Sequence, residues 1–326
     1  MSSFPHVFSS DQVGSRLLSM PLLSLAIQPR TAILYSKAAA QFIEWYQKQP
    51  GTYSSYFHID SYLSLYLNLL YESGTSTMGQ ANNTVFGLMH VVPALRLQLP
   101  TARRCLKGWK KSRPTLSWPP LSWELACMLA IQMSSVGWYD EALALLISYD
   151  GYFRINELLK CKLRHFYCYS VSFPPVYQFR LKETKTGANK LVTMTNNELG
   201  AALMSYISTR YHGQSLSTRI FQFDDNKYRD KFRKGCELLG WQSVGFVPHS
   251  VRHGHASDDF NAGVPIETIQ VRGRWASIQS TRNYIQGGRV HLIRGRLTST
   301  LPVLPSYNAR FILEMMQKAY LQSLPQ

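Results

Sequence analysis

Four residues in the C-terminal third of the chain combine types and spacings that could do chemistry on an anion. His249 and Arg252 are three residues apart, which makes them neighbours on one face of a helix. Trp275 follows His249 by 26 residues, and Tyr284 follows Trp275 by nine. Arg252 lies among apolar residues, where an unpaired guanidinium group is costly unless an anion is its partner. Since a tyrosine hydroxyl can act as a nucleophile, the set predicts a site that binds an anion and attacks it.

Two upstream segments extend this set. Arg154-Ile155-Asn156-Glu157 places a second arginine among apolar residues. Lys185 lies between two strand-like stretches, 176–182 and 190–194, which predict a β-hairpin with Lys185 in or beside its turn. Taken alone, each of these residues would be an ordinary packing or solvated side chain. Their order and spacing together make coincidence improbable.

The complete pattern resembles the tyrosine recombinase (phage integrase) family, in its Cre-like form with tryptophan at the position of the commoner second histidine. The resemblance covers about residues 150–286, with Arg154 in the first-arginine box and Lys185 as the hairpin lysine. It implies a mainly α protein with a small β-sheet (α+β). In such a protein a helical core-binding domain and a catalytic domain form a C-shaped clamp on double-stranded DNA. It also implies a mobile-element origin and a homo-tetramer on paired target sites.

The resemblance implies how the charged residues and the nucleophile act. Tyr284 would attack the scissile phosphate, giving a 3′-phosphotyrosine and a free 5′-hydroxyl. Arg154 and Arg252 would each present a planar, permanently charged fork to the non-bridging oxygens. Lys185 would protonate the leaving 5′-oxygen.

The remaining implied roles concern proton transfer and support. His249 would assist proton transfer around the nucleophile, the Trp275 indole N–H would hydrogen-bond the phosphate, and Glu157 would orient neighbouring Lys or Arg side chains. No cofactor or metal is predicted, because the acidic residues lack the pairing of two-metal sites. His253 and His255 have no second ligand pair nearby, so a zinc site is not predicted either.

Composition independently indicates a polyanionic partner. The 326 residues include 35 Lys plus Arg and 19 Asp plus Glu, a formal net charge of +16. At 45% hydrophobic residues the chain is too apolar for a disordered basic tail, and it has no apolar stretch of membrane-spanning length. Five cysteines without a CxxC pair predict a reducing compartment, hence an intracellular protein. That compartment would be the nucleus for a eukaryotic element, and the cytoplasm or nucleoid otherwise.

The elements that must position these residues fall into five predicted segments. We expect a loose arm over 1–30, a helical core-binding domain over 31–113, a Pro- and Trp-containing linker over 114–123 and a catalytic domain over 124–304. The last segment, 305–326, contains an amphipathic helix over about 308–323. This helix would dock on a neighbouring protomer or pack within its own chain.

Three groups of basic residues are candidates for DNA binding. The first precedes the linker and is either a solvated helix end or a strap along a phosphate backbone. The second forms one face of a helix expected over 225–240, and the third flanks Gly273. The candidate residues are Arg103, Arg104, Lys107, Lys110 and Lys111 in the first group, Lys227, Lys231 and Lys234 in the second, and Arg272 and Arg274 in the third.

Three functions fit these observations. The first is a site-specific DNA recombinase or integrase. The second is a monomeric DNA-relaxing enzyme of the type IB topoisomerase kind, which shares the Tyr, Arg and His chemistry. The third is a domesticated DNA-binding protein that no longer cuts. Because none of the six catalytic positions is replaced, the sequence favours the first.

Overall fold

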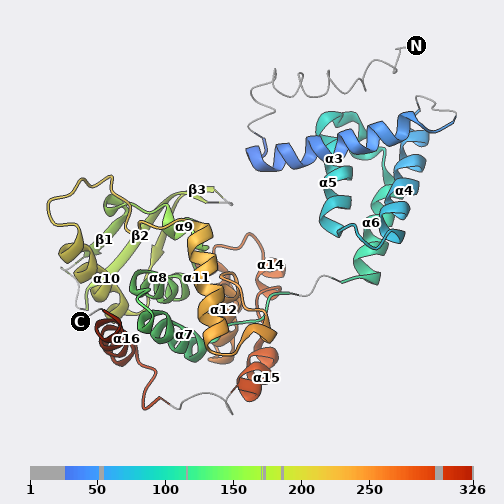
Figure 1. The fold of residues 1–326 in the computed structure, drawn as a ribbon. Helices are drawn as coiled ribbons and strands as arrows, with labels where there is room; N and C mark the ends of the chain where they lie inside the picture. Colours follow the sequence, from blue (N-terminus) through green and yellow to red (C-terminus); the bar gives the residue numbers. More distant parts are fainter. Residues whose placement is uncertain are drawn as a thin grey trace. The chain divides into compact units, whose positions relative to one another are not determined.

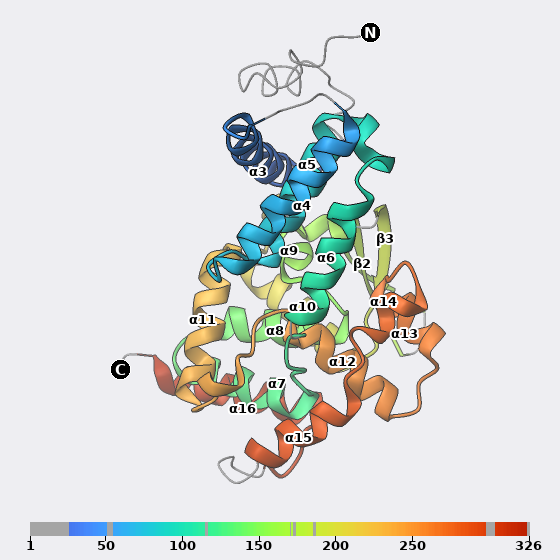
Figure 2. The same cartoon turned by 90° about the vertical axis from the view of Figure 1, so that its right-hand side faces the viewer.

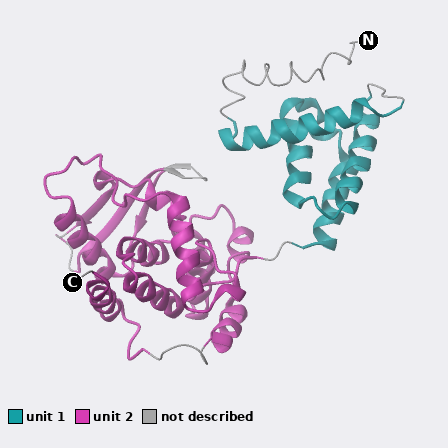
Figure 3. Ribbon diagram, in the orientation of Figure 1, with its two compact units in different colours: residues 1–116 teal, residues 117–326 magenta. Residues whose placement is uncertain are grey.

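The computed structural model describes residues 26–50, 55–114, 117–169, 171, 174–184, 187–297 and 304–324. Most of the predicted arm and Lys185 lie outside these residues. The chain divides into two compact units, residues 1–116 and 117–326 (Figure 3). The described residues are mainly helical with one small antiparallel sheet, which confirms the predicted fold class (Figure 1). None of the helices in these ranges is long and apolar enough to cross a membrane.

Unit 1 is helical throughout its described part. Its elements are α3 (Pro29–Gln47), α4 (Tyr56–Glu72), α5 (Met78–Val91), the 3-10 helix η2 (Pro93–Leu97) and α6 (Pro100–Ser112). Apolar residues at helical spacing, such as Phe42, Leu63 and Val85, form its core. The buried Asp60 of α4 caps α6, because its carboxylate accepts from the backbone N–H groups of Thr101 and Ala102, both at 2.9 Å.

Helix α6 has one apolar face and one basic face. Ala102, Leu106 and Trp109 are buried, whereas the cations of the cluster before the linker are exposed. The cluster is therefore one face of a helix, because these three apolar residues anchor the helix in the core of unit 1. Whether this face lies along a phosphate backbone stays a prediction.

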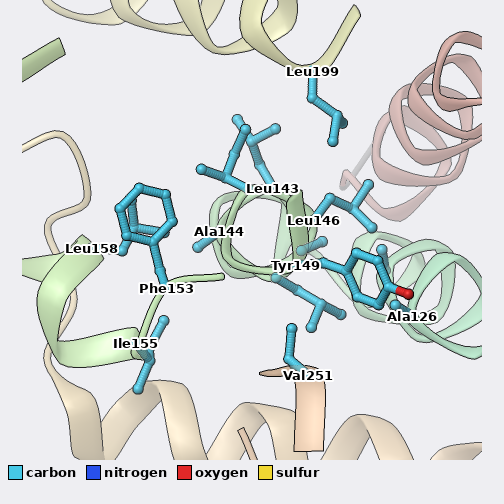
Figure 4. Packing of buried hydrophobic residues seen from close by; sticks show 14 of the residues in the cluster. Ala126, Leu143, Ala144, Leu146, Tyr149, Phe153, Ile155, Leu158, Leu199 and Val251 are labelled. Carbon is cyan, nitrogen blue, oxygen red and sulfur yellow. The ribbon is translucent and has the colours of Figure 1, made fainter. Parts of the chain in front are cut away.

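Unit 2 is built around α8 (Tyr139–Asp150), in which every residue from Glu141 to Asp150 is buried. Figure 4 shows its side chains pointing in all directions, toward residues of neighbouring elements such as Ala126, Leu158 and Val251. These neighbours belong to α7 (Trp123–Ser135), α9 (Ile155–Leu159) and α12 (Ser250–Asn261). A helix that is apolar on all sides is a core helix, and here it supports the elements that carry the predicted site.

A three-stranded antiparallel sheet covers one side of this core, in the order β1-β2-β3. Its strands are β1 (Phe166–Tyr169), β2 (Val176–Thr184) and β3 (Gly187–Thr193), preceded by the 3-10 helix η3 (Leu163–His165). The predicted hairpin is β2 and β3, with Phe179 opposite Val192. Strand β1 was not predicted, because four residues are too few to show alternation.

The helix after the sheet is α10 (Asn197–Arg210). Thr195 and Glu198 have the spacing of a capping box, but Thr195 is not the N-cap. Asn196 is the N-cap and accepts from the backbone N–H groups of Glu198 and Leu199, both at 3.1 Å. Thr195 is already engaged, since its backbone N–H donates to the buried carboxylate of Asp150 at 3.0 Å. Helix α11 (Asp225–Leu238) follows as expected and precedes the short η4 (Gln242–Val244).

Four helices complete the region of the predicted site: α12, α13 (Ile266–Gly273), α14 (Ile278–Arg282) and α15 (Gly287–Leu297). Figure 2 shows α12, α13 and α14 side by side, and α12 also packs on α15. Tyr284 lies in a turn two residues after the end of α14. Helix α15 was not predicted, since a start at Gly287-Gly288 disfavours a helix.

The described residues next to both ends of the predicted catalytic domain pack on unit 2. Residues 119–122, in the predicted linker, are buried in unit 2, and the Leu121 N–H donates to the Ser250 carbonyl at 3.0 Å. Gly254 permits this close approach, because a Cβ there would lie 1.6 Å from the Leu121 carbonyl oxygen. At the other end, α16 (Ala309–Ser323) packs on α7 of the same chain and buries Ile312 and Met316.

Candidate active site

Five of the six predicted catalytic residues come together at one place in unit 2. Arg154 is the N-cap of α9, His249 the N-cap of α12, and Arg252 lies in the first turn of α12. Trp275 follows α13, and Tyr284 follows α14. The sixth residue, Lys185, lies outside the described residues, and its place at the site stays a prediction.

Arg252 is fully buried beside the two aromatic residues of the set. Its guanidinium carbon lies 4.9 Å from the centre of the Trp275 ring and 5.6 Å from that of Tyr284. Its N–H groups donate to the Tyr152 and Gly273 carbonyls, the latter at 2.7 Å, while Nε has no partner among the described residues. Burial and the charges of Arg154 and Arg274 lower its pKa. A buried guanidinium without its own carboxylate is fitted to receive an anion.

Tyr284 and His249 face each other at the edge of this arginine. The Tyr284 hydroxyl lies 3.1 Å from Nε2 of His249, and the centres of the Trp275 and Tyr284 rings are 4.5 Å apart. Burial, together with the charges of Arg252, His253 and Arg154, lowers the pKa of His249 to about 3. The imidazole is therefore neutral at pH 7, and in the tautomer with its proton on Nδ1 it accepts a hydrogen bond from the Tyr284 hydroxyl.

Glu157 connects the arginines of the site. Its carboxylate binds Arg154 at 2.6 Å through one oxygen and Arg274 at 2.9 Å through the other. Burial raises its pKa, but the charges of Arg274 and Arg154 outweigh this and lower it overall. Arg274 is itself buried and donates to the Gly151 and Tyr152 carbonyls at 3.1 and 2.8 Å. The Arg274 side chain thus faces the protein interior and holds Glu157, and its predicted DNA contact stays a prediction.

Trp275 packs tightly against the preceding turn. A Cβ on Gly273 would lie 1.9 Å from the Trp275 ring, so only glycine allows the ring to take this position. Trp275 is buried, yet its indole Nε1 has no hydrogen-bond partner among the residues that the structure describes. A buried N–H without a partner is costly, and a phosphate oxygen would satisfy it.

Gln286, two residues after the tyrosine, ties this region to the start of unit 2. Its side-chain nitrogen lies 3.0 Å from Ser117 Oγ, 3.1 Å from the Trp118 carbonyl and 2.9 Å from Nδ1 of His253. The His253 ring in turn stacks on Tyr284, with 4.5 Å between ring centres. No sequence pattern signals this contact, because 169 residues separate Ser117 from Gln286.

The candidate DNA-binding residues of α6 and α11 differ in how their charges are paired. On α6, none of the candidates forms an ion pair with a described carboxylate. On α11, Lys231 pairs with the buried Glu141 at 2.6 Å and Lys234 with Asp230 at 2.9 Å. Lys227, the third candidate on α11, forms no ion pair with a described carboxylate. Because pairing offsets the charge of the other two, α6 is the stronger candidate surface.

Arg272 lies at the side of the site and is partly engaged. It binds Asp259 at 2.6 Å, and Asp259 also accepts from the Tyr152 hydroxyl at 2.7 Å. Its guanidinium carbon lies 5.4 Å from the centre of the Tyr152 ring. These contacts make Arg272 a support for the segment that holds Arg252, so its DNA contact stays a prediction.

No group of three or more His, Cys, Asp or Glu side chains with the arrangement of a metal site occurs within the described ranges.

Comparisons with known proteins identify the family and the fold. The model of the phage integrase family matches residues 125–288, half of the chain. No curated protein matches the sequence significantly. Among solved structures, XerH site-specific recombinase bound to difH substrate in a post-cleavage complex has a TM-score of 0.61 and 14% identity, covering 88% of this chain and 84% of that one.

Two further structures have the same fold. The Tn1549 transposon integrase in complex with circular intermediate DNA has a TM-score of 0.57 and 14% identity, covering 87% of this chain and 98% of that one. The lambda integrase dimer bound to a COC′ core site has a TM-score of 0.55 and 13% identity, covering 86% and 76%.

Proposed function

Because the chain belongs to the phage integrase family and is a tyrosine site-specific recombinase, we propose that Tyr284 is its nucleophile. The observation that carries this proposal is the 3.1 Å contact of the Tyr284 hydroxyl with a neutral His249, beside the buried Arg252. His249 takes the phenol proton as the Tyr284 oxygen attacks phosphorus. The bond from phosphorus to the 5′-oxygen breaks, leaving a 3′-phosphotyrosine and a 5′-hydroxyl.

The other residues stabilise the charge that develops on the phosphate. Arg252 and Arg154 bind the non-bridging oxygens, and the free Trp275 N–H donates to one of them. Glu157 holds Arg154 at this position and is itself fixed by Arg274. Lys185 protonates the leaving oxygen. Rejoining is the reverse reaction, in which a 5′-hydroxyl attacks the phosphotyrosine.

The substrate is double-stranded DNA, and we infer the assembly and origin from the relatives. The unpaired cations of α6 bind the phosphate backbone, and two DNA-bound dimers pair as a homo-tetramer. The chain acts for a mobile element, as the Tn1549 transposon integrase does by its name. It works where that element's DNA lies: the nucleus in a eukaryote, the cytoplasm or nucleoid in a bacterium. No comparison favours the relaxing enzyme or the non-cleaving DNA-binding protein.

The test works without a known target sequence. A pool of nicked suicide duplexes with a randomised centre is incubated with the protein, and covalent adducts are isolated on a denaturing gel and sequenced. Wild-type protein should form an adduct that Tyr284→Phe abolishes. Tyr71→Phe in unit 1 is the matched control and should retain it. An adduct that persists in Tyr284→Phe would show that the nucleophile lies elsewhere.

A further inference from the structure

A small basic pocket lies between η3 and β2 of unit 2, outside the set of residues described above as catalytic. It has a volume of about 270 Å³, roughly that of nine water molecules. Its lining includes five cations, three from the segment after α9 and two from β2: Lys160, Lys162, Arg164, Arg180 and Lys182. The two on β2 alternate with buried Leu181, so both point to the outer face of the sheet.

These five charges have no carboxylate partner among the described residues. Arg180 donates to the Asn189 side-chain oxygen at 3.4 Å, a neutral partner. Glu157 also lines the pocket, but its two oxygens already bind Arg154 and Arg274. The pocket therefore keeps a strong positive potential, in contrast to α11, where four of the five cations form ion pairs.

His165, at the pocket wall, responds to this potential. Burial and the charges of Arg164, Lys182, Lys162 and Arg180 lower its pKa. Like charges around so small a space repel one another, and a bound anion would relieve that repulsion.

The pocket lies close to the catalytic arginine along α9. Arg154 caps the start of this helix and Lys160 its end. Six residues at the helical rise place them about 9 Å apart along the axis. That distance corresponds to about three base-pair steps of duplex DNA.

We infer that this pocket binds a backbone phosphate of the DNA substrate near the scissile one, and so fixes the strand relative to Tyr284. The inference rests on the proposed function and adds a phosphate contact that is separate from the chemistry. The group recognised is a phosphodiester, which two walls of the pocket hold: one formed by β2, with Arg180 and Lys182, and one formed by the segment after α9, with Lys160, Lys162 and Arg164.

The experiment compares the salt dependence of DNA binding between charge-matched variants. The first variant, Arg180→Gln/Lys182→Gln, removes the charges of the wall formed by β2. The second variant, Lys160→Gln/Lys162→Gln, removes two charges of the wall formed by the segment after α9. Arg229→Gln/Arg233→Gln removes two charges from α11 that are paired with Asp225, Asp230 and Glu237. Binding of a fluorescent duplex of arbitrary sequence is measured by anisotropy over a salt series, and circular dichroism checks folding.

Loss of one phosphate contact should reduce the slope of log Kobs against log[salt] by about 0.9 for either wall variant. Between 50 and 200 mM salt, the wild type should then lose about 3.5-fold more affinity than the variant. The α11 variant should keep the wild-type slope. Wall variants that also keep it would overturn the inference.

Two further arms separate other outcomes. The first is a thermal shift in which inorganic phosphate raises the Tm of the wild type but not of either wall variant, while the salt dependence of DNA binding is the same in all proteins. That result would mean that the pocket binds a small anion and not DNA, and it would overturn the inference. The suicide-substrate adduct reports the proposed function independently. If wild-type protein forms the adduct and the slopes do not change, only the pocket inference fails.

Discussion

Glu157→Gln tests whether the arginines of the active site depend on one shared carboxylate. The substitution keeps the size of the side chain but leaves Arg274 and Arg154 without the negative charge that lies 2.9 and 2.6 Å from them. Arg274 is buried, and Arg252 adds a third positive charge nearby. Removing one partner of a buried ion pair costs about 3–5 kcal/mol, which we expect as the loss in free energy of unfolding.

The assay is equilibrium unfolding in urea, with thermal melting as a second measurement. For a unit of this size, 1 kcal/mol shifts Tm by about 2–4 °C, so the variant should melt roughly 6–20 °C lower. Sulfate or DNA should restore part of the loss by supplying the missing anion. Glu237→Gln removes an exposed carboxylate that pairs with Arg233, and should cost less than about 0.5 kcal/mol. A Glu157→Gln protein as stable as this control would refute the reasoning.

Three further predictions concern the same site. Burial lowers the pKa of His249 to about 3 and that of His253 to about 4, whereas the usual value is near 6.5. Their contribution to stability is therefore fully present above pH 6.5 and is lost as the pH falls below it. Between pH 7 and 5, the free energy of unfolding measured in urea should fall by up to about 2 kcal/mol for each histidine. The fall should be smaller in His253→Asn than in the wild type, and an equal fall in both proteins would contradict this prediction. Trp275→Phe keeps the ring stacking but lacks the N–H, and should slow single-turnover adduct formation about 10²-fold with Tm little changed; an unchanged rate would exclude the phosphate bond. Gly273→Ala drives a Cβ into the Trp275 ring and should lower the free energy of unfolding in urea by about 1–3 kcal/mol. Gly108→Ala is the control, because a Cβ at this exposed position of α6 meets no atom within 4 Å, and it should not lower the free energy of unfolding.

The sequence predicted those parts of the site that depend on local spacing. His249 and Arg252 share a helix turn, and both lie at the site with Tyr284. The pairing of Lys234 with Asp230 was also visible as an i,i+4 pattern, although charge alone suggested a free basic face. The alternation of Lys160, Lys162 and Arg164 is a comparable signal for the basic pocket.

Other features depend on tertiary contacts that no local pattern encodes. Arg274 and Glu157 are 117 residues apart, so a lone arginine beside glycine suggested a surface role. Lys231 meets Glu141 across 90 residues. The four-residue strand β1 and the Gly-Gly start of α15 form because the core supports them, against their weak local preferences.

The contacts of Gln286 with Ser117 and Trp118 join the start of unit 2 to the segment that carries Tyr284. From Gln286 the contacts continue to His253, whose ring stacks on Tyr284. Arg289 adds a second bond to the same segment, since it donates to the Ser117 carbonyl at 2.6 Å. The position of Tyr284 is thus coupled to that of Ser117 within unit 2, so that Gln286→Ala would loosen both segments together.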